Sequence, residues 1–168
     1  MKMIFVSGLK DVDKDTIVDL AIKNSGKLGK TSHVDMAGSL DEDLLKAGSS
    51  VIARQIARSF YEDMEKKMIQ KLKGREEDVM VSGYLTVKHP GLGFLACLPD
   101  DFFRVFRPDA IVLLEKDGLE DDDREHQRLN RNYAANYALM SGASLKIIKM
   151  SKDNMMNAVR ELGNMIRS

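Results

Sequence analysis

Tryptophan is absent from this sequence of 168 residues, and cysteine occurs once, as Cys97. One cysteine excludes an internal disulfide and a cysteine-rich metal site, which leaves a small packed side chain as the expected role of Cys97. Long hydrophobic runs are also missing, and the apolar start MKMIFV is shorter than a signal peptide or a membrane span. We therefore expect a protein of the reducing cytoplasm with no membrane partner.

An excess of charge of either sign is missing as well. Lysine and arginine number 26, and aspartate and glutamate also number 26, so the formal net charge is zero. A balanced charge gives little attraction toward nucleic acid, and there is no basic stripe with interleaved aromatic residues. Hydrophobic residues make up 43% and charged residues 31% of the chain, which is typical of a globular protein. The length favours one domain over 1–168.

Strand and helix patterns alternate along the whole chain. The short apolar runs predict five strands, at 1–7, 31–36, 78–84, 107–115 and 144–150. The helical patterns fall at 14–25, 39–48, 50–73, 100–106, 124–140 and 154–167. Ser39 is the expected cap of the second helix, and 86–99, rich in glycine and proline, is expected to be a loop. The alternation predicts an α/β fold, a five-stranded parallel sheet with helices on both faces.

The first strand leads into SGLKDVDKDT, residues 7–16, and then into a helix. A phosphate-binding loop of the form G-x-x-x-x-G-K-[ST] occurs at such a place. Gly8 and Lys14 match its first glycine and its lysine, whereas Asp13 and Asp15 replace its second glycine and its hydroxyl residue. A carboxylate about 4 Å from a phosphate charge costs roughly 1 kcal/mol in water and about 4 kcal/mol at an intermediate dielectric. These aspartates, with Asp11, therefore oppose the binding of a triphosphate.

A local role accounts for the aspartates. The first turn of a helix has unpaired N–H groups and a partial positive charge, so Asp is favoured there. We interpret Asp13 or Asp15 as the helix cap, which places a protein carboxylate where a phosphate would otherwise bind. The alternative is a working phosphate loop, in which the aspartates turn away or coordinate metal.

The second half of the chain carries longer motifs. The segments TVKHPGLGFLACLP, RPDAIVLLE and EHQRLNRNYAANYALMSGASLKIIK cover most of residues 78–150. They resemble segments of the archaeal adenylate kinases in the same order, and the first strand and loop align with that family without gaps. The resemblance implies a P-loop fold of three layers, a homotrimer, and transfer of a phosphoryl group from Mg-ATP to AMP, which gives two ADP.

The resemblance also implies roles for single residues. The family's phosphate loop, G-x-P-G-x-G-[KG]-[ST]-T, corresponds to residues 8–16, where the proline and two glycines are replaced. The nucleotide-binding candidates that it implies are Gly8, Lys14, Thr16, Tyr84 and Lys88. If the protein is active, the catalytic candidates are Lys14 and Arg131, and the ligands are ATP and AMP with Mg²⁺.

Two further parts of the family's machinery are altered. The third strand ends in Ser82-Gly83-Tyr84 where the family has D-T-H, so the carboxylate that helps to hold Mg²⁺ is missing from that strand. The arginine-rich lid is reduced to the acidic residues 116–123, followed by Arg124 and Arg128. The acidic run EDDD within it is interpreted as a solvated turn and helix start, with binding of a divalent cation as the alternative.

The monophosphate side of the family's site is shortened within 37–73. Arg54 and Arg58 are either substitutes for its arginines or solvated surface charges. Lys88 borders the monophosphate site in the family, or else it is exposed on a structural loop. Tyr84 either stacks on a base or packs at the end of its strand.

Other kinds of site have little support. The histidines at 33, 89 and 126 lack the spacing of a zinc site, and the sequence alone indicates no Ser–His–Asp or Cys–His arrangement. His126 belongs to the family motif, without a role that follows from the sequence.

Three functional hypotheses follow. Alteration of the phosphate loop, the metal carboxylate and the lid indicates an adenylate-kinase-like protein without normal kinase activity, acting as a weak nucleotide-binding or protein-assembly module. The alternative is an active nucleoside monophosphate kinase in which Lys14, Thr16 and Arg131 act with a divergent loop. The third is a chiefly structural role in an oligomer or a protein complex.

Overall fold

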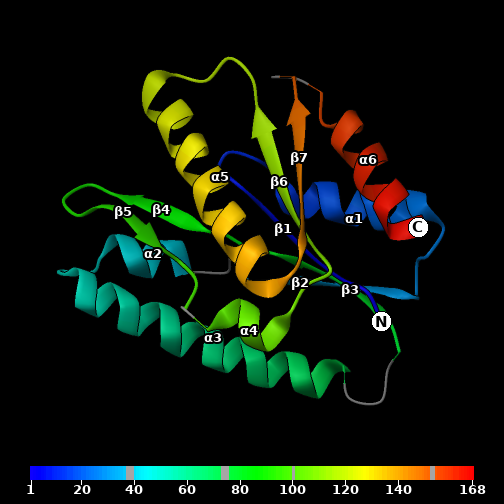
Figure 1. Ribbon diagram of the computed structural model, residues 1–168, viewed down its shortest axis with the longest axis horizontal. Coiled ribbons are helices and arrows are strands. Elements are labelled where there is room, and N and C mark those ends of the chain that lie inside the picture. The colour runs from blue at the N-terminus through cyan, green and yellow to red at the C-terminus, as the bar shows by residue number, and fades with distance from the viewer. Residues whose placement is uncertain (37–39, 73–75, 100, 152–153) are drawn as a thin grey trace.

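A five-stranded parallel sheet forms the centre of the molecule, in the order β2-β3-β1-β6-β7 (Figure 1). The computed structural model describes residues 1–36, 40–72, 76–99, 101–151 and 154–168. The strands of the sheet are β1 (Met3–Gly8), β2 (Thr31–Asp35), β3 (Asp78–Ser82), β6 (Ala110–Lys116) and β7 (Ser144–Met150). The predicted sheet is thereby confirmed.

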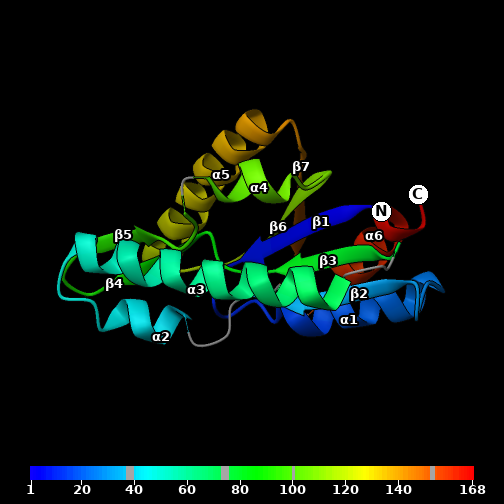
Figure 2. The same cartoon turned by 90° about the horizontal axis from the view of Figure 1, so that it is seen from below.

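Helices cover both faces of this sheet, as predicted, and each face has its own apolar core (Figures 1 and 2). On one face, α1 (Lys14–Ser25) packs against α6 (Met156–Arg167). The other face is covered by α3 (Ser50–Leu72), α4 (Phe102–Phe106) and α5 (Asp121–Ser141). The central strands are buried on both sides, which is why they read as continuous apolar runs in the sequence.

The segment expected to be a loop contains an antiparallel hairpin, which corrects that expectation. Strands β4 (Thr86–His89) and β5 (Gly93–Ala96) pair across a turn at Pro90 and Gly91. His89 closes the turn, because its Nδ1 accepts the N–H groups of Gly91 and Leu92, both at 3.0 Å. Four-residue strands are too short to show a clear period of two in the sequence. The hairpin lies beside the short helix α2 (Leu40–Leu45) in both views.

Helix boundaries differ from the sequence expectations by a few residues. Helix α5 begins at Asp121 rather than at Arg124, because three aspartates form its first turn, where negative charge is favourable. Helix α6 begins at Met156. The predicted cap Ser39 and the expected end of the long helix at 73 lie outside the described residues. None of the helices in the described part of the chain is long and apolar enough to cross a membrane.

Candidate functional site

The loop between β1 and α1 is anchored by its packing. Gly8 ends β1, and a Cβ atom there would lie 2.9 Å from the carbonyl oxygen of Leu114, so only glycine fits without a shift of the backbone. Leu9 and Val12 are buried, and Val12 belongs to the core beneath α1 and α6. The loop is therefore held to the body of the protein by apolar side chains.

Three backbone N–H groups in and after this loop bond to acceptors within the same segment. The Val12 N–H donates to the carbonyl of Leu9 at 3.0 Å, and the Lys14 N–H donates to the carbonyl of Val12 at 2.8 Å. Asp13 is the cap of α1, and its Oδ1 accepts the Thr16 N–H at 3.4 Å. Phosphate loops point successive N–H groups into one concavity, often by alternating right-handed and left-handed residues. No residue from 8 to 16 has a positive φ, so the loop lacks this alternation.

Lys14, the candidate phosphate ligand, is folded into the protein. Lys14 is 3% exposed, and its Nζ lies 3.6 Å from the centre of the Tyr84 ring, a cation–π contact. Burial lowers the pKa of Lys14, against the attraction of nearby carboxylates that include Asp15, Asp35 and Asp41. Burial raises the pKa of Tyr84 to about 12. Two candidates that are distant in sequence are thus brought together, in a contact that occupies the lysine.

Asp15 and Ser82 meet at the carboxyl end of β3. The Ser82 hydroxyl donates to Asp15 Oδ1 at 2.5 Å. By the family resemblance, the first position carries a hydroxyl and the second a carboxylate, so the two functional groups have exchanged places. The third strand lacks the carboxylate, as the sequence indicates, and Asp15 brings one to the same corner from the neighbouring helix.

His33 joins this corner from β2. Its Nε2 lies 2.8 Å from Ser82 Oγ, and its Nδ1 lies 2.8 Å from Asp19 Oδ1. Ser82, His33 and Asp19 thereby have the atom connectivity of a hydrolase triad, which the sequence did not reveal. Ser82 is fully buried and its proton is directed to Asp15, so a substrate carbonyl has no approach to the hydroxyl. The network is structural.

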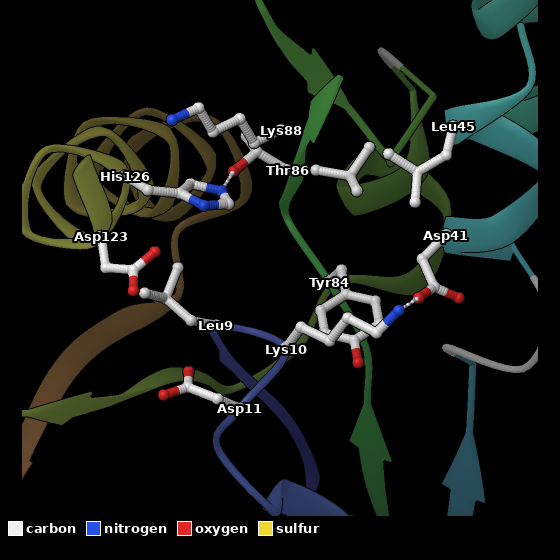
Figure 3. Close-up of a pocket in the computed structure, with 11 residues that line it drawn as sticks. Leu9, Lys10, Asp11, Asp41, Leu45, Tyr84, Thr86, Lys88, Asp123 and His126 are labelled. Carbon is white, nitrogen blue, oxygen red and sulfur yellow. Dashed lines mark hydrogen bonds and ion pairs between the residues drawn. The ribbon is translucent and has the colours of Figure 1, made fainter. Parts of the chain in front are cut away.

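A pocket of about 260 Å³ lies between the β1–α1 loop and the hairpin (Figure 3). Four parts of the chain form its wall: the loop, α2, the segment from Tyr84 to β4, and α5. The lining residues are Leu9, Lys10, Asp11, Asp41, Leu45, Tyr84, Thr86, Val87, Lys88, Asp123 and His126. Two lysines therefore face three aspartates. Tyr84 and Lys88 are the two predicted binding residues that line this pocket.

The lysines around the pocket are already paired with carboxylates. Lys10 Nζ lies 2.8 Å from the buried Asp41, and Lys88 Nζ lies 2.7 Å from Asp122. These hydrogen bonds raise the pKa of both lysines. Beyond the pocket, Lys116 Nζ donates to the Asp11 carbonyl at 2.7 Å and lies 3.5 Å from its carboxylate.

The EHQ segment of α5 positions the hairpin and the end of β6. Thr86 donates to Asn130 Oδ1 at 2.5 Å and lies 2.8 Å from His126 Nε2, with Thr86 and Asn130 both buried. The Gln127 amide pairs with both backbone groups of Lys116, at 3.0 and 3.1 Å. His126, for which the sequence indicated no role, therefore supports the hairpin, and burial lowers its pKa.

Arg131, the catalytic candidate on α5, forms a bidentate ion pair with Glu115, with both N–O distances 2.5 Å. The Glu115 side chain is 3% exposed and that of Arg131 is 42% exposed. Arg131 does not line the pocket. Thr16 is exposed on α1. Its role in binding and that of Arg131 in catalysis stay predictions.

The remaining arginine candidates lie on the surface of α3. Arg54 and Arg58 are exposed, and Arg58 lies 3.7 Å from Asp101 in another pocket. Neither lines the pocket beside the loop. Among the described residues, no group of three His, Cys, Asp or Glu side chains is arranged to hold a metal ion.

The sheet order and the β1–α1 loop at its carboxyl edge define a P-loop fold of the adenylate kinase type. No protein-family model matches the chain. Adenylate kinases do match: that of Thermoplasma acidophilum is 30% identical over 165 residues, covering 85% of this chain and 86% of the relative. That of Methanocaldococcus jannaschii is 30% identical with 96% of each chain covered, and that of Methanopyrus kandleri is 29% identical with 99% and 98% covered. The chain belongs to the adenylate kinase family.

Proposed function

We propose that this member of the adenylate kinase family lacks phosphoryl transfer between Mg-ATP and AMP and acts as a weak nucleotide-binding or protein-assembly module. The closed β1–α1 loop carries the proposal. The N–H groups of Val12, Lys14 and Thr16 donate to acceptors within the loop, and Lys14 Nζ packs on Tyr84. A phosphate would have to displace these contacts while approaching the Asp13 carboxylate.

The charges around the pocket support the same proposal. Phosphoryl transfer depends on cations that neutralise charge developing on the phosphoryl oxygens. Here Lys10, Lys88 and Arg131 each already neutralise a protein carboxylate. The segment that replaces the family's lid, 116–123, contributes five acidic residues, one lysine and no arginine.

Calorimetric titration with Mg-ATP, followed by a coupled assay with Mg-ATP and AMP, tests the proposal. We expect a dissociation constant for Mg-ATP of about 1 mM or weaker and turnover below about 1 s⁻¹, the low end for kinases. A dissociation constant in the micromolar range together with turnover above that limit would overturn it.

A variant that restores the family's loop tests the cause. Asp11→Gly, Asp13→Gly and Asp15→Thr together remove three carboxylates and return two glycines and a hydroxyl. We expect Mg-ATP affinity to rise by at least about tenfold. A control with Glu62→Gln, Asp63→Asn and Glu76→Gln removes the same charge from exposed positions outside the loop. An equal gain in Mg-ATP affinity in the control would show that net charge causes the effect. No gain in the loop variant would contradict the proposal that the carboxylates of the loop prevent phosphate binding.

One observation favours an active kinase as the second candidate. Asp15 and Ser82 keep a carboxylate and a hydroxyl in contact, although their positions are exchanged. In that case Lys14, Thr16 and Arg131 act with the divergent loop, and Asp15→Asn lowers kcat in the coupled assay. Absence of turnover in the wild-type protein excludes this candidate.

Assembly is the second half of the main proposal, and the family resemblance implies a homotrimer. Light scattering on the purified chain measures its mass directly. A mass three times that of the 18.9 kDa chain is the expected result. A monomer at all accessible concentrations would contradict self-assembly and leave binding to another protein as the form to test.

A further inference from the structure

One carboxylate in the pocket beside the hairpin has no ion-pair partner. Lys10 neutralises Asp41, Lys88 is taken by Asp122, and Asp11 contacts Lys116. Asp123, which also lines the pocket, forms no ion pair or hydrogen bond within the part of the chain that the structure describes, and its charge acts on Lys88 and His126 only through space. The pocket therefore offers an acceptor that carries negative charge, and it repels a second anion.

His126 supplies a neighbouring acceptor. It lies three residues after Asp123 on α5, so the two side chains share a face of the helix, and both line the pocket (Figure 3). The only hydroxyl proton of Thr86 goes to Asn130, so Thr86 Oγ1 accepts from His126 Nε2–H. In the neutral ring, Nδ1 then carries a lone pair, and the lowered pKa of His126, caused by burial, favours the neutral ring.

Apolar groups form the rest of the wall. Leu9, Leu45, Val87 and the ring of Tyr84 line the same space. Its volume, about 260 Å³, falls just below the roughly 300–1,000 Å³ of sites for drug-sized ligands. A single ring system with a small substituent matches this volume, whereas a whole nucleoside triphosphate does not.

We infer that this pocket binds a small amino-substituted aromatic ring that carries no phosphate. The amino group donates to Asp123 and to His126 Nδ1, and the ring packs among Leu9, Val87 and Tyr84. The inference rests on the proposed loss of phosphate binding, because it assigns the pocket to the opposite class of ligand, neutral or cationic rather than anionic.

Adenosine and AMP form a matched pair of probes, since they share the amino-substituted ring and differ by the phosphate. In calorimetric titrations of the purified full chain, we expect adenosine to bind at least about tenfold more tightly than AMP. Asp123→Asn removes the charge of the acceptor, and we expect it to weaken adenosine binding about tenfold. Asp121→Asn is the control, because Asp121 is exposed in the same turn and lies outside the pocket.

Each outcome decides the inference. AMP binding as tight as adenosine binding overturns it, as does the absence of heat with adenosine at millimolar concentration. Equal losses of adenosine affinity in Asp123→Asn and Asp121→Asn also overturn it, because the effect then comes from the total negative charge in the first turn of α5 and not from contact with Asp123. Mg-ATP titrated into the same sample separates the two proposals. If neither ATP nor adenosine gives heat, the proposed function stands and this inference is wrong. If both bind tightly, the proposed function is contradicted and this inference stands.

Discussion

The β1–α1 loop and the inward face of α5 lie at the same edge of the sheet, but they use their polar groups differently. On α5, His126 contacts β4, and Gln127 and Arg131 contact β6, and each contact spans at least 11 residues of sequence. In the loop, the N–H groups of Val12 and Lys14 bond to acceptors two or three residues away. Long-range contacts hold elements together, whereas the local contacts occupy N–H groups that a ligand could otherwise use.

This difference separates two parts of a family motif. The EHQRLNR segment of α5 keeps its residues because they position the hairpin and the end of β6. Under the proposed function, the loop has exchanged ligand-binding residues for residues that bond to one another. A family relationship is therefore strong evidence for the scaffold, and weaker evidence for the reaction.

Removal of Arg131 gives the largest effect and tests the scaffold side. In Arg131→Ala the carboxylate of Glu115, 3% exposed, loses its partner, and we expect a loss of about 3 kcal/mol in the free energy of unfolding. Arg128→Ala on the same helix is the control, because its side chain is 76% exposed and lies 3.9 Å from Glu125. Urea denaturation measures both variants. Equal losses in the free energy of unfolding would contradict a special role of Arg131 in holding the scaffold together.

Reversal of the Asp15–Ser82 exchange tests the corner shared by the loop and β3. Ser82→Asp alone places a second carboxylate against Asp15 in a buried position. Addition of Asp15→Thr restores a hydroxyl–carboxylate pair, and we expect it to recover about 1–2 kcal/mol of the lost stability. A double-mutant cycle by thermal denaturation measures this coupling. Additive losses would show that the two side chains do not form a pair.

Lys14→Met tests whether the buried lysine serves the fold. An apolar side chain of similar size leaves stability at neutral pH within about 1 kcal/mol of the wild type. Because burial lowers the pKa of Lys14 in the folded protein below 10.5, the unfolded chain binds this proton more tightly. Wild-type stability therefore gains from Lys14 as the pH rises from the folded-state pKa toward 10.5. Lys14→Met lacks that gain.

The difference between the two stability curves isolates Lys14 from other alkaline groups. Denaturation from neutral to alkaline pH provides both curves. A difference that does not change with pH would contradict a desolvated, charged lysine.

Lys88→Ala has the smallest expected effect. Lys88 and Asp122 are exposed at their ion pair, and solvent screens such pairs. We expect no measurable change in Tm and no change in AMP binding. Lys66→Ala, which removes another exposed lysine paired with an aspartate, is the matched comparison. Loss of AMP affinity in Lys88→Ala alone would show that the lysine keeps the monophosphate role that the family resemblance implies.

Features with a local cause could be predicted from the sequence. Apolar runs gave the five strands, and the preference for Asp at a helix start indicated the cap that Asp13 forms. The hairpin was missed because neither four-residue strand shows a period. The acidic run at 120–123 was interpreted as a turn and helix start, and three of its members proved to be the first helical turn.

Features that depend on distant residues could not be predicted. Asp15 and Ser82 are separated by 67 residues, and no pattern in either segment indicates the other. The contact between Lys14 and Tyr84 has the same origin, because it depends on how β3 lies beside the start of α1. The Ser82–His33–Asp19 network combines three elements, so its members look unrelated in the sequence.

Gly8 bears on how much a partial motif can prove. A side chain at Gly8 would collide with the Leu114 carbonyl whether or not a nucleotide ever enters the loop. The first glycine of the motif is thus a requirement of the junction between β1 and β6, and its presence carries no information about phosphate. The other motif positions carry that information, because no such collision requires glycine at Asp11 or Asp13. For proteins of this fold, diagnosis of nucleotide binding should therefore weigh the motif positions unequally.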